Sequence, residues 1–175
     1  MSGMLAGILG LVILLVLLFL GIIAVIALFP SEGFVVEAWR ALARGLFGWG
    51  DFISPVVLLW GAFILLTHRG RPVAFRLTCV LLLAVIFGAY VHSVWCDTPY
   101  FAVSNFFNGV ADLWDDGQSI SSHCGGAVAG LFGIALRSAL SKYGAAIVLA
   151  AAFLLMLVKG LNLSLSGIWG AVVAW

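Results

Sequence analysis

Long apolar stretches separated by short polar segments dominate this sequence of 175 residues. No charged side chain occurs from Met1 to Ser31, and the centre of this stretch, Leu9 to Phe29, is almost entirely Leu, Ile, Val, Phe and Ala. Three further uncharged stretches lie between Asp51 and His68, between Arg76 and Asp97, and between Lys142 and Lys159. A helix needs roughly 20 apolar residues to cross the hydrocarbon core of a bilayer. The pattern therefore predicts four transmembrane helices.

Two of the four stretches are short for a transmembrane helix. Residues 52–67 and 143–158 hold 16 uncharged residues each, so flanking residues must extend both helices. Long basic side chains such as Lys142, Lys159 and Arg69 can reach the polar interface while their stems stay in the lipid. A signal peptide is the alternative interpretation of the first stretch, which however lacks a basic start and a small-residue cleavage site.

The segments ahead of the second and fourth stretches repeat apolar residues at helical spacing. The first stripe is formed by Val35, Trp39, Leu42 and Leu46, with Glu37, Arg40 and Arg44 on the other face and Gly48 and Gly50 at the end. The second stripe is formed by Val128, Leu131, Phe132, Ala135 and Ala139. Such spacing is typical of amphipathic helices that lie along a membrane interface. We therefore predict an all-α integral membrane protein of two helical hairpins, each with an extracytoplasmic amphipathic helix.

The two halves of the chain resemble each other. At a displacement of 90 positions, residues 61–70 and 151–160 share four identities and a basic residue ahead of the final glycine, and GLFG occurs at 45–48 and 130–133. We predict a weak parallel tandem repeat, about 1–70 and 77–160, within a membrane domain of residues 1–160. Chance similarity among apolar sequences of low diversity is the alternative. The uncharged tail, 161–175, is expected at the membrane interface, with a fifth span as the alternative.

Composition agrees with a lipid environment. Apolar residues make up 65% of the chain and charged residues 9%, whereas a soluble domain carries about 25% charged residues. The net charge of +1 and the lack of a basic run argue against direct nucleic-acid contact by this segment.

The placement of the basic residues predicts the orientation. The connection between the second and third spans, together with the end of the fourth, carries four basic and no acidic side chains: Arg69, Arg71, Arg76 and Lys159. Cytoplasmic loops are enriched in Lys and Arg, so these residues are expected inside the cell. All seven acidic residues and the other four basic residues then lie outside. Both termini are predicted to be cytoplasmic.

An outer segment of residues 96–124 is bracketed by two cysteines, Cys96 and Cys124. Because disulfides persist on the oxidising side of the membrane, we predict a disulfide here, worth roughly 3 to 4 kcal/mol for a loop of about 28 residues. A zinc set of His92, Cys96, His123 and Cys124 is the alternative, although its spacing lacks a C-x2-C pair. Cys79, within the third span, is expected to be an inert buried thiol.

Aromatic, acidic and small residues of the chain suggest further contacts. The outer segment holds Tyr100, Phe101, Phe106, Phe107 and Trp114, for which local packing is the favoured interpretation over the outer leaflet or a second subunit. Its acidic cluster, Asp112, Asp115 and Asp116, lacks the order of a calcium-binding EF-hand loop and is expected to be a solvated edge. Small-residue pairs that permit close helix contact occur as Gly3 with Gly7 and Gly126 with Gly130.

Two stretches carry a more specific pattern: VEAWRALARGLFGWGDFISPVVLLWGAFILLTHRG (36–70) and GGAVAGLFGIALRSALSKYGAAIVLAAAFLLMLVKGLNLS (125–164). In each, a helix rich in Gly and Leu leads into a span that ends near a basic residue, and the second opens with Gly125 and Gly126. In this pattern the chain resembles the N-terminal four-span membrane domain of the FtsK/SpoIIIE family of septal DNA translocases. Residues 96–124 are longer than this family usually carries at this place.

The resemblance implies a membrane anchor at the bacterial division septum that self-associates, as a hexamer, and tethers a DNA-translocating ATPase. It also implies division-site membrane proteins as partners. The motor itself is not in this chain, which has no G-x-x-x-x-G-K-[ST] motif and no Gly-Lys pair. The chain ends where the linker of the family would begin, so we expect a fragment of a longer protein. We predict no enzyme, cofactor or metal in this segment.

Other functions are less well supported by the sequence. A channel or transporter normally carries ionisable residues or helix breaks within its spans, whereas the span interiors here lack Asp, Glu, Lys and Arg, and Pro55 lies near a span start. An intramembrane enzyme would need a nucleophile or metal set, and neither H-E-x-x-H nor G-x-S-x-G occurs. A small channel, a transporter or a stand-alone membrane scaffold remains the alternative.

Overall fold

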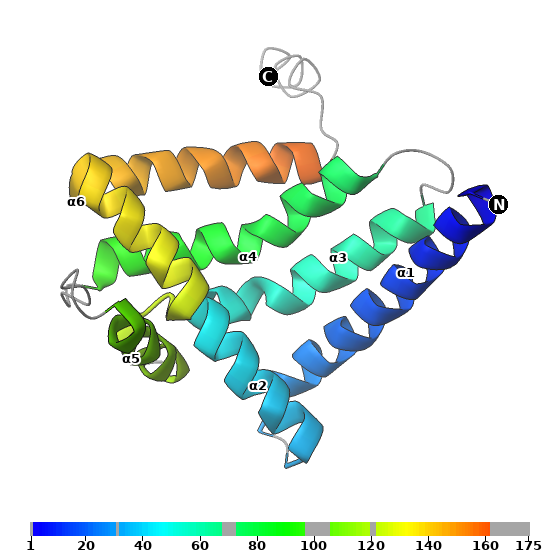
Figure 1. Cartoon of the computed structure of the whole chain (residues 1–175), viewed down its shortest axis with the longest axis horizontal. Helices are drawn as coiled ribbons and strands as arrows, with labels where there is room; N and C mark the ends of the chain where they lie inside the picture. The colour runs from blue at the N-terminus through cyan, green and yellow to red at the C-terminus, as the bar shows by residue number, and fades with distance from the viewer. Residues whose placement is uncertain (1, 31, 68–72, 97–105, 120–121, 162–175) are drawn as a thin grey trace, which may run out of the picture.

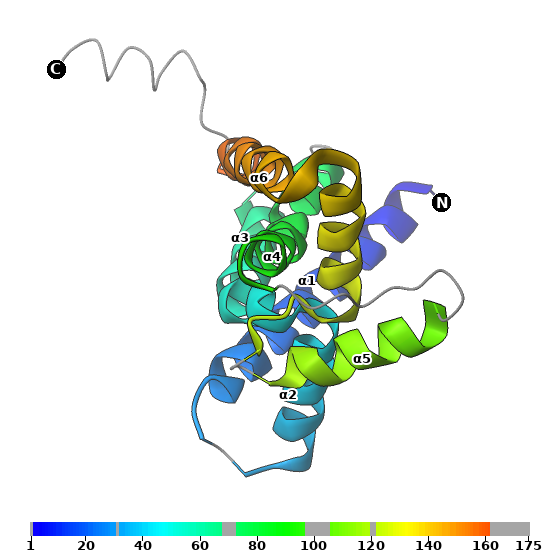
Figure 2. The same ribbon diagram turned by 90° about the vertical axis from the view of Figure 1, so that its left-hand side faces the viewer.

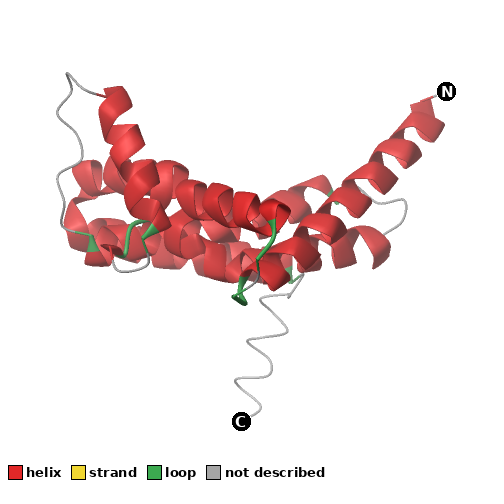
Figure 3. Cartoon of the chain, turned by 90° about the horizontal axis from the view of Figure 1, so that it is seen from below, coloured by secondary structure: helices red, strands yellow, loops and turns green. Residues whose placement is uncertain are grey.

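The apolar stretches of the chain fold as long helices. The computed structural model describes residues 2–30, 32–67, 73–96, 106–119 and 122–161, with the backbone alone for residues 2–6. Within these ranges every regular element is helical, and no strand occurs (Figure 3). The elements in chain order are α1 (Ser2–Ala27), α2 (Phe34–Phe47), the 3-10 helix η1 (Gly48–Ile53), α3 (Ser54–Thr67), α4 (Ala74–Trp95), α5 (Phe106–Gln118) and α6 (Gly126–Gly160).

Among the described residues, four helical segments are long and apolar enough to cross a membrane: Gly7–Ala27, Phe34–Thr67, Ala74–Trp95 and Gly126–Gly160. Each overlaps one of the four apolar stretches expected to span. The second reaches this length only because α2, η1 and α3 follow one another without a break, since α3 alone has 14 residues. The all-helical character predicted from the sequence is therefore confirmed for the described part of the chain, and its four long apolar helices are compatible with a multi-pass membrane protein.

The long helices pack in pairs (Figure 1). α1 lies against α3, where a side chain at Gly21 would meet Leu59. α4 lies against α6, and the core between them contains Ile86, Ala89 and Leu149. α3 joins the two pairs through contacts of Val57 and Ile64 with Val80 and Leu83 of α4. The interior is thus built along α4, which has more buried residues than α1.

α6 is divided into two arms by a sharp bend. Ser141 has φ 63° and ψ 172°, which no helical residue adopts, and it separates residues 126–140 from residues 142–160. Figure 2 looks along α4 and shows the second arm running beside α4, while the first arm runs in a different direction. The first arm crosses the end of α4, where an added Cβ atom on Gly133 would meet the carbonyl oxygen of Ala89 at 2.9 Å, and α6 also contacts α5 and α2. The chain therefore places a short helix ahead of the last apolar helix, as α2 and η1 precede α3.

The helix ends gather at two opposite ends of the molecule. The start of α1, the end of α3, the start of α4 and the end of α6 lie together on the right of Figure 1. α2, η1, α5 and the first arm of α6 lie at the other end. A hydrogen bond fastens the first of these ends, because Arg76 Nε donates to the carbonyl oxygen of Gly160 at 2.7 Å.

The apolar stripes of α2 and of the first arm of α6 do not form their buried faces. Val35 of α2 is 56% exposed, and Leu42, Val128 and Phe132 are exposed as well. The buried positions of these helices are small: Ala43 and Gly45 in α2, and Ala127, Ala129, Gly130 and Gly133 in α6. Small residues let helix backbones approach closely. The helices therefore pack inward through small residues and turn their large apolar side chains outward.

Candidate functional site

Glycines concentrate where α2, η1, α4, α5 and α6 meet at one end of the molecule. At each of these glycines, an added Cβ atom would come within about 3 Å of an atom of a neighbouring element. We call this region the glycine junction; its members are Gly45, Gly48, Gly50, Gly88, Gly117, Gly125, Gly126, Gly130 and Gly133. Backbone segments thus touch here with almost no side chains between them.

Two of these glycines have backbone angles that favour glycine. Gly48, at the end of α2, has φ 51°, and Gly126, at the start of α6, has φ 68°. They face each other, because a Cβ atom on Gly126 would lie 2.8 Å from the nitrogen of Gly48. The amide of Trp49 donates to the carbonyl oxygen of Cys124 at 3.2 Å. The end of α2 is therefore joined to the start of α6 through backbone contacts.

His92 lies in the interior of this junction and is 2% exposed. The amide of Gly125 donates to its Nδ1 at 3.3 Å. This nitrogen therefore carries a lone pair rather than a proton. The Cys124 sulfur lies 3.6 Å from the same nitrogen, so the thiol is placed to share its proton with the imidazole. The sequence favoured an interfacial hydrogen bond for His92, and the structure gives it a buried one.

Cys96 and Cys124, the predicted disulfide partners, are brought together at the junction. Their side chains are hydrogen-bonded to each other, and they are 3% and 1% exposed. This hydrogen bond, together with burial, raises the pKa of the Cys124 thiol above its ordinary value. None of the three cysteines is joined in a disulfide in the structure. The contact between the two side chains agrees with the expected pairing, while the covalent bond stays a prediction.

The backbone of Cys96 also forms hydrogen bonds. Its amide donates to the carbonyl oxygen of His92 at 3.0 Å, and its own carbonyl oxygen accepts from Arg137 Nη1. Arg137 belongs to the first arm of α6. The end of α4 is therefore connected to α6 by two contacts of Cys96: its carbonyl oxygen with Arg137, and its side chain with Cys124, which precedes α6.

The alternative zinc set is not assembled. The ring of His123 stacks on Trp49, with centroids 5.1 Å apart and planes 9° from parallel. Among the described residues, no group of three or more His, Cys, Asp or Glu side chains is placed to hold a metal ion. Cys79, in the first half of α4, is buried as expected.

The aromatic residues of the outer segment behave in two ways. Trp114 of α5 packs over Gly45 of α2, where any side chain would collide with the indole. This is the local packing favoured by the sequence. Phe106 and Phe107 stack edge to face on each other, and Phe107 is 85% exposed. Tyr100 and Phe101 lie outside the described residues.

Only some of the residues that the sequence suggested as helix contacts or topology determinants have contacts in the structure. Gly126 and Gly130 belong to the junction, but Gly7 has no atom within 4 Å of an added Cβ. Gly7 therefore makes no close helix contact within this chain, and a contact with a second subunit stays a prediction. The surroundings of Gly3 are not among those described. Arg76 binds Gly160 and Lys159 is exposed beside it, whereas Arg69 and Arg71 lie outside the described residues.

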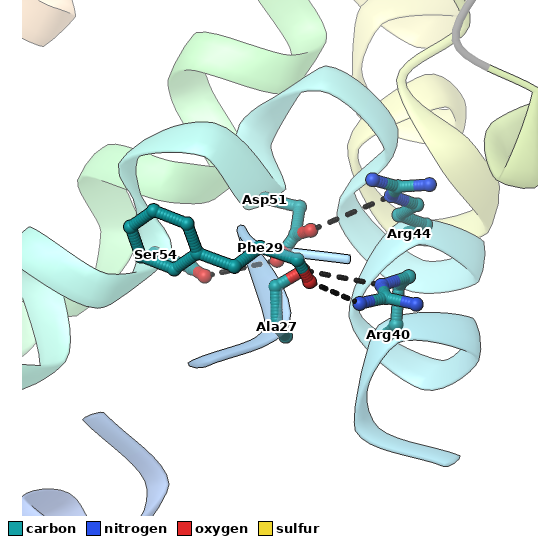
Figure 4. A network of polar contacts seen from close by, with 6 residues as sticks. All are labelled: Ala27, Phe29, Arg40, Arg44, Asp51 and Ser54. Carbon is teal, nitrogen blue, oxygen red and sulfur yellow. Dashed lines mark hydrogen bonds and ion pairs between the residues drawn. The ribbon is translucent and has the colours of Figure 1, made fainter. Parts of the chain in front are cut away.

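A polar network near the junction was missed by the sequence analysis (Figure 4). Arg40 of α2 donates to the carbonyl oxygens of Ala27 and Phe29 at 3.1 and 2.9 Å. Arg44 forms an ion pair with Asp51 at 3.7 Å, and Ser54 Oγ donates to Asp51 Oδ1 at 3.0 Å. The available signal was the placement of two arginines one helical turn apart before an aspartate that precedes an apolar helix. The network joins the end of α1 to α2 and to the start of α3.

No protein-family model, curated protein or solved structure matches this chain.

Proposed function

We propose that this chain is the membrane-anchoring and oligomerising domain of a septal DNA translocase. In this proposal it resides in the bacterial inner membrane with both termini in the cytoplasm. The motor that consumes ATP and moves DNA lies outside this chain, and this segment makes no contact with the nucleic acid. Its partners are the lipid bilayer, further copies of itself and division-site membrane proteins.

The observation that carries the anchor proposal is the common position of four helix ends. The start of α1 and the end of α6 lie at the same end of the molecule, with Arg76 and Lys159 (Figure 1). Basic residues at membrane boundaries favour the cytoplasmic side. A motor joined to either terminus would therefore be on the side where chromosomal DNA and ATP are found.

The arrangement of the other end supports two hairpins with interfacial helices. In this proposal α1 with α3 and α4 with the second arm of α6 are the two hairpins, and α2 and the first arm of α6 lie in their outer connections; the contacts between these helices support this. The outward stripes of these short helices, such as Val35 and Phe132, suit contact with the boundary between headgroups and acyl chains. Arg137 and Arg40 bind backbone carbonyls there and stay at the polar end.

Both stretches that carry the resemblance fold in the same order. Residues 36–70 include most of α2, then η1 and α3, and residues 125–164 include α6 with its bend at Ser141. In each, a short helix packed through glycines precedes a bend and an apolar helix. The septal and DNA-translocating part of the proposal rests on this resemblance alone.

Topology and cellular position test the proposal directly. Alkaline phosphatase, which is active only outside the cytoplasm, is fused after Gly160 or inserted within residues 97–105, and a fluorescent protein is fused at the same places. We expect fluorescence from the first position and phosphatase activity from the second. A fluorescent fusion of the full-length protein is expected to gather at division sites. Phosphatase activity after Gly160 would overturn the anchor orientation, and uniform membrane fluorescence would overturn the septal function.

A further inference from the structure

The anchor function does not use the His92, Cys96 and Cys124 side chains, although all three are deeply buried at the glycine junction. Cys124 is in contact with both of the others: its sulfur lies 3.6 Å from His92 Nδ1, and its thiol is hydrogen-bonded to Cys96. Cys96 ends α4, whereas Cys124 directly precedes Gly125 and α6. The two sulfurs thus meet across the ends of the longest pair of packed helices.

We propose that Cys96 and Cys124 are a redox-active pair that closes to an intramolecular disulfide, with His92 as the residue that removes the proton from Cys124. Formation of this disulfide in the cell rests on the orientation proposed above, because disulfides persist outside the cytoplasm. The reaction partner is a disulfide-bearing thiol oxidant, either a protein disulfide or a small-molecule disulfide.

The reaction is a thiol–disulfide exchange in two steps. The Cys124 thiol gives its proton to His92 Nδ1, and the resulting thiolate attacks one sulfur of the oxidant. A mixed disulfide forms, and the other sulfur of the oxidant leaves as a thiolate that takes up the proton. The Cys96 thiol then loses its proton and its sulfur attacks Cys124 Sγ, which forms the Cys96–Cys124 bond and breaks the mixed disulfide. The second sulfur of the oxidant leaves as a thiolate and takes up the proton lost by Cys96. Two protein thiols are oxidised, and one oxidant disulfide is reduced to two thiols.

The position of His92 fits this role. Its Nδ1 accepts a hydrogen bond from the amide of Gly125 and therefore carries the lone pair that a base needs. Gly125 follows Cys124 in the chain, so this contact holds the cysteine beside Nδ1. Because the nitrogen has one lone pair, transfer of the Cys124 proton to Nδ1 takes the place of the hydrogen bond from Gly125. His123, which is next to Cys124 in sequence, is stacked on Trp49 instead.

α5 covers the cysteine pair. The carbonyl oxygen of its Leu113 lies 3.9 Å from Cys124 Sγ, and Leu113 itself is fully buried. An oxidant can reach the thiols only when α5 is not packed in this place. Once the bond is formed, the same cover limits the access of a reductant. We therefore expect the disulfide to be reduced more slowly in the folded protein than after denaturation.

The first test counts thiols in the full-length protein taken directly from cells. Cells are lysed in denaturing detergent with a maleimide polymer that adds a fixed mass to every thiol, with or without prior reduction. Cys79 lies in α4 apart from the pair in sequence and provides an internal control. We expect one modified cysteine without reductant and three with it, plus any outside residues 1–175. Three without reductant would contradict the disulfide in cells.

A second test distinguishes the ability of Cys96 and Cys124 to form a disulfide from their location outside the cytoplasm. Purified protein is reduced, freed from the reductant and incubated with oxidised glutathione, and its thiols are counted again. Closure in this assay but not in cells would support the pairing and overturn the extracytoplasmic placement. Absence of closure in both assays would overturn the pairing itself. Loss of the two thiols through a dimer on a non-reducing gel would also overturn it, because the proposed bond lies within one chain.

The contribution of His92 is measured by the rate of closure with oxidised glutathione. His92→Gln retains an oxygen that can accept from Gly125 but cannot act as the base, and general-base assistance is worth roughly a hundredfold or more. We expect closure to slow at least tenfold in His92→Gln and to stay unchanged in the control variant His123→Gln. Equal rates in wild type and His92→Gln would overturn the role of His92. The two thiol-counting tests use the wild-type protein, so they test the disulfide even if His92→Gln does not fold.

Discussion

At the scale of single residues, glycine determines how closely the elements of this protein meet. Gly48 and Gly126 adopt positive φ angles and place the end of α2 against the start of α6. At Gly130, a side chain would meet Leu113 Cδ2 at 3.0 Å and His92 Nδ1 at 3.6 Å. Gly7 belongs to the same kind of small-residue pair in the sequence but faces open space. The same motif therefore serves packing at one place and has no contact within the chain at the other.

Substitution of these two glycines should separate the two cases. We expect Gly130→Leu to lower the thermal stability of the detergent-held protein, because overpacking at a tight contact costs about 1 to 3 kcal/mol and here would displace α5. Gly7→Leu is the matched control and should leave the unfolding temperature unchanged or slightly raised, since leucine favours a helix over glycine. Thermal unfolding followed by circular dichroism measures both. Equal loss of stability in the two variants would contradict the assigned packing.

Asp51 is the residue on which the polar network depends. It is buried, and its two carboxylate oxygens bind Arg44 and Ser54. Asp51→Ala should destabilise the protein by about 1 to 3 kcal/mol because both partners lose their acceptor, whereas Asp51→Asn keeps an oxygen for Ser54 and should cost less. Thermal unfolding of both variants is compared with Glu37→Ala, an exposed carboxylate on α2. A loss for Glu37→Ala as large as that for Asp51→Ala would contradict this role.

At the scale of elements, the bend in α6 lets its two arms contact different parts of the molecule. The second arm packs along α4, and the first arm reaches α5 and the glycine junction. A straight helix would carry the first arm away from the junction and separate Gly126 from Gly48. Ser141 takes the positive φ that the bend requires, and a β-carbon is strained there by about 1 to 2 kcal/mol.

The strain at Ser141 can be measured by comparing two substitutions. Ser141→Gly removes the β-carbon and should be more stable than Ser141→Val by about 1 kcal/mol or more, because a branched side chain is least compatible with this conformation. In a continuous helix the order would be reversed, since valine is the better helix former of the two. The unfolding temperatures of both variants decide between the two orders. Valine as the more stable variant would show that α6 is straight at this position.

At the scale of the whole molecule, much of the apolar surface is turned outward. α1 touches mainly α3, and its remaining surface carries exposed leucine, isoleucine and phenylalanine side chains. The exposed face of the second arm of α6, with Ile147 and Leu154, is similar. Such surfaces suit lipid and also suit the further copies of the chain that the proposed function requires.

The proposed self-association should be visible in the mass of the intact assembly. We expect native mass spectrometry of the protein in detergent or nanodiscs to give one defined multimer. This multimer should survive reductant, because the proposed disulfide lies within one chain. The mass of the single denatured chain serves as the reference for the subunit number. A strict monomer at all concentrations would remove self-association from this segment.

The sequence by itself determined the helical character and the positions of four helices long and apolar enough to cross a membrane. Leucine-rich stretches without charges have no other stable placement than a lipid environment, and there only helices satisfy their own backbone hydrogen bonds. The end of α2 at Gly48 also followed from the sequence, because glycine favours the conformation that ends a helix. The small-residue pair of Gly126 and Gly130 was recognised by its spacing, and Cys96 and Cys124 by their placement around the outer segment.

Only the tertiary structure decided which of these features meet. Periodicity identified apolar stripes on α2 and α6 but not that the small residues face inward, because lipid and protein interior are both apolar and the pattern does not distinguish them. It did not place His92 beside Cys124, since the two residues are 32 positions apart in the sequence and α5 lies between them. Nor did it show that Gly45, Gly48 and Gly88 form one junction. Contacts between distant backbone segments leave no periodic signal, and glycine is chosen there for the space it leaves free.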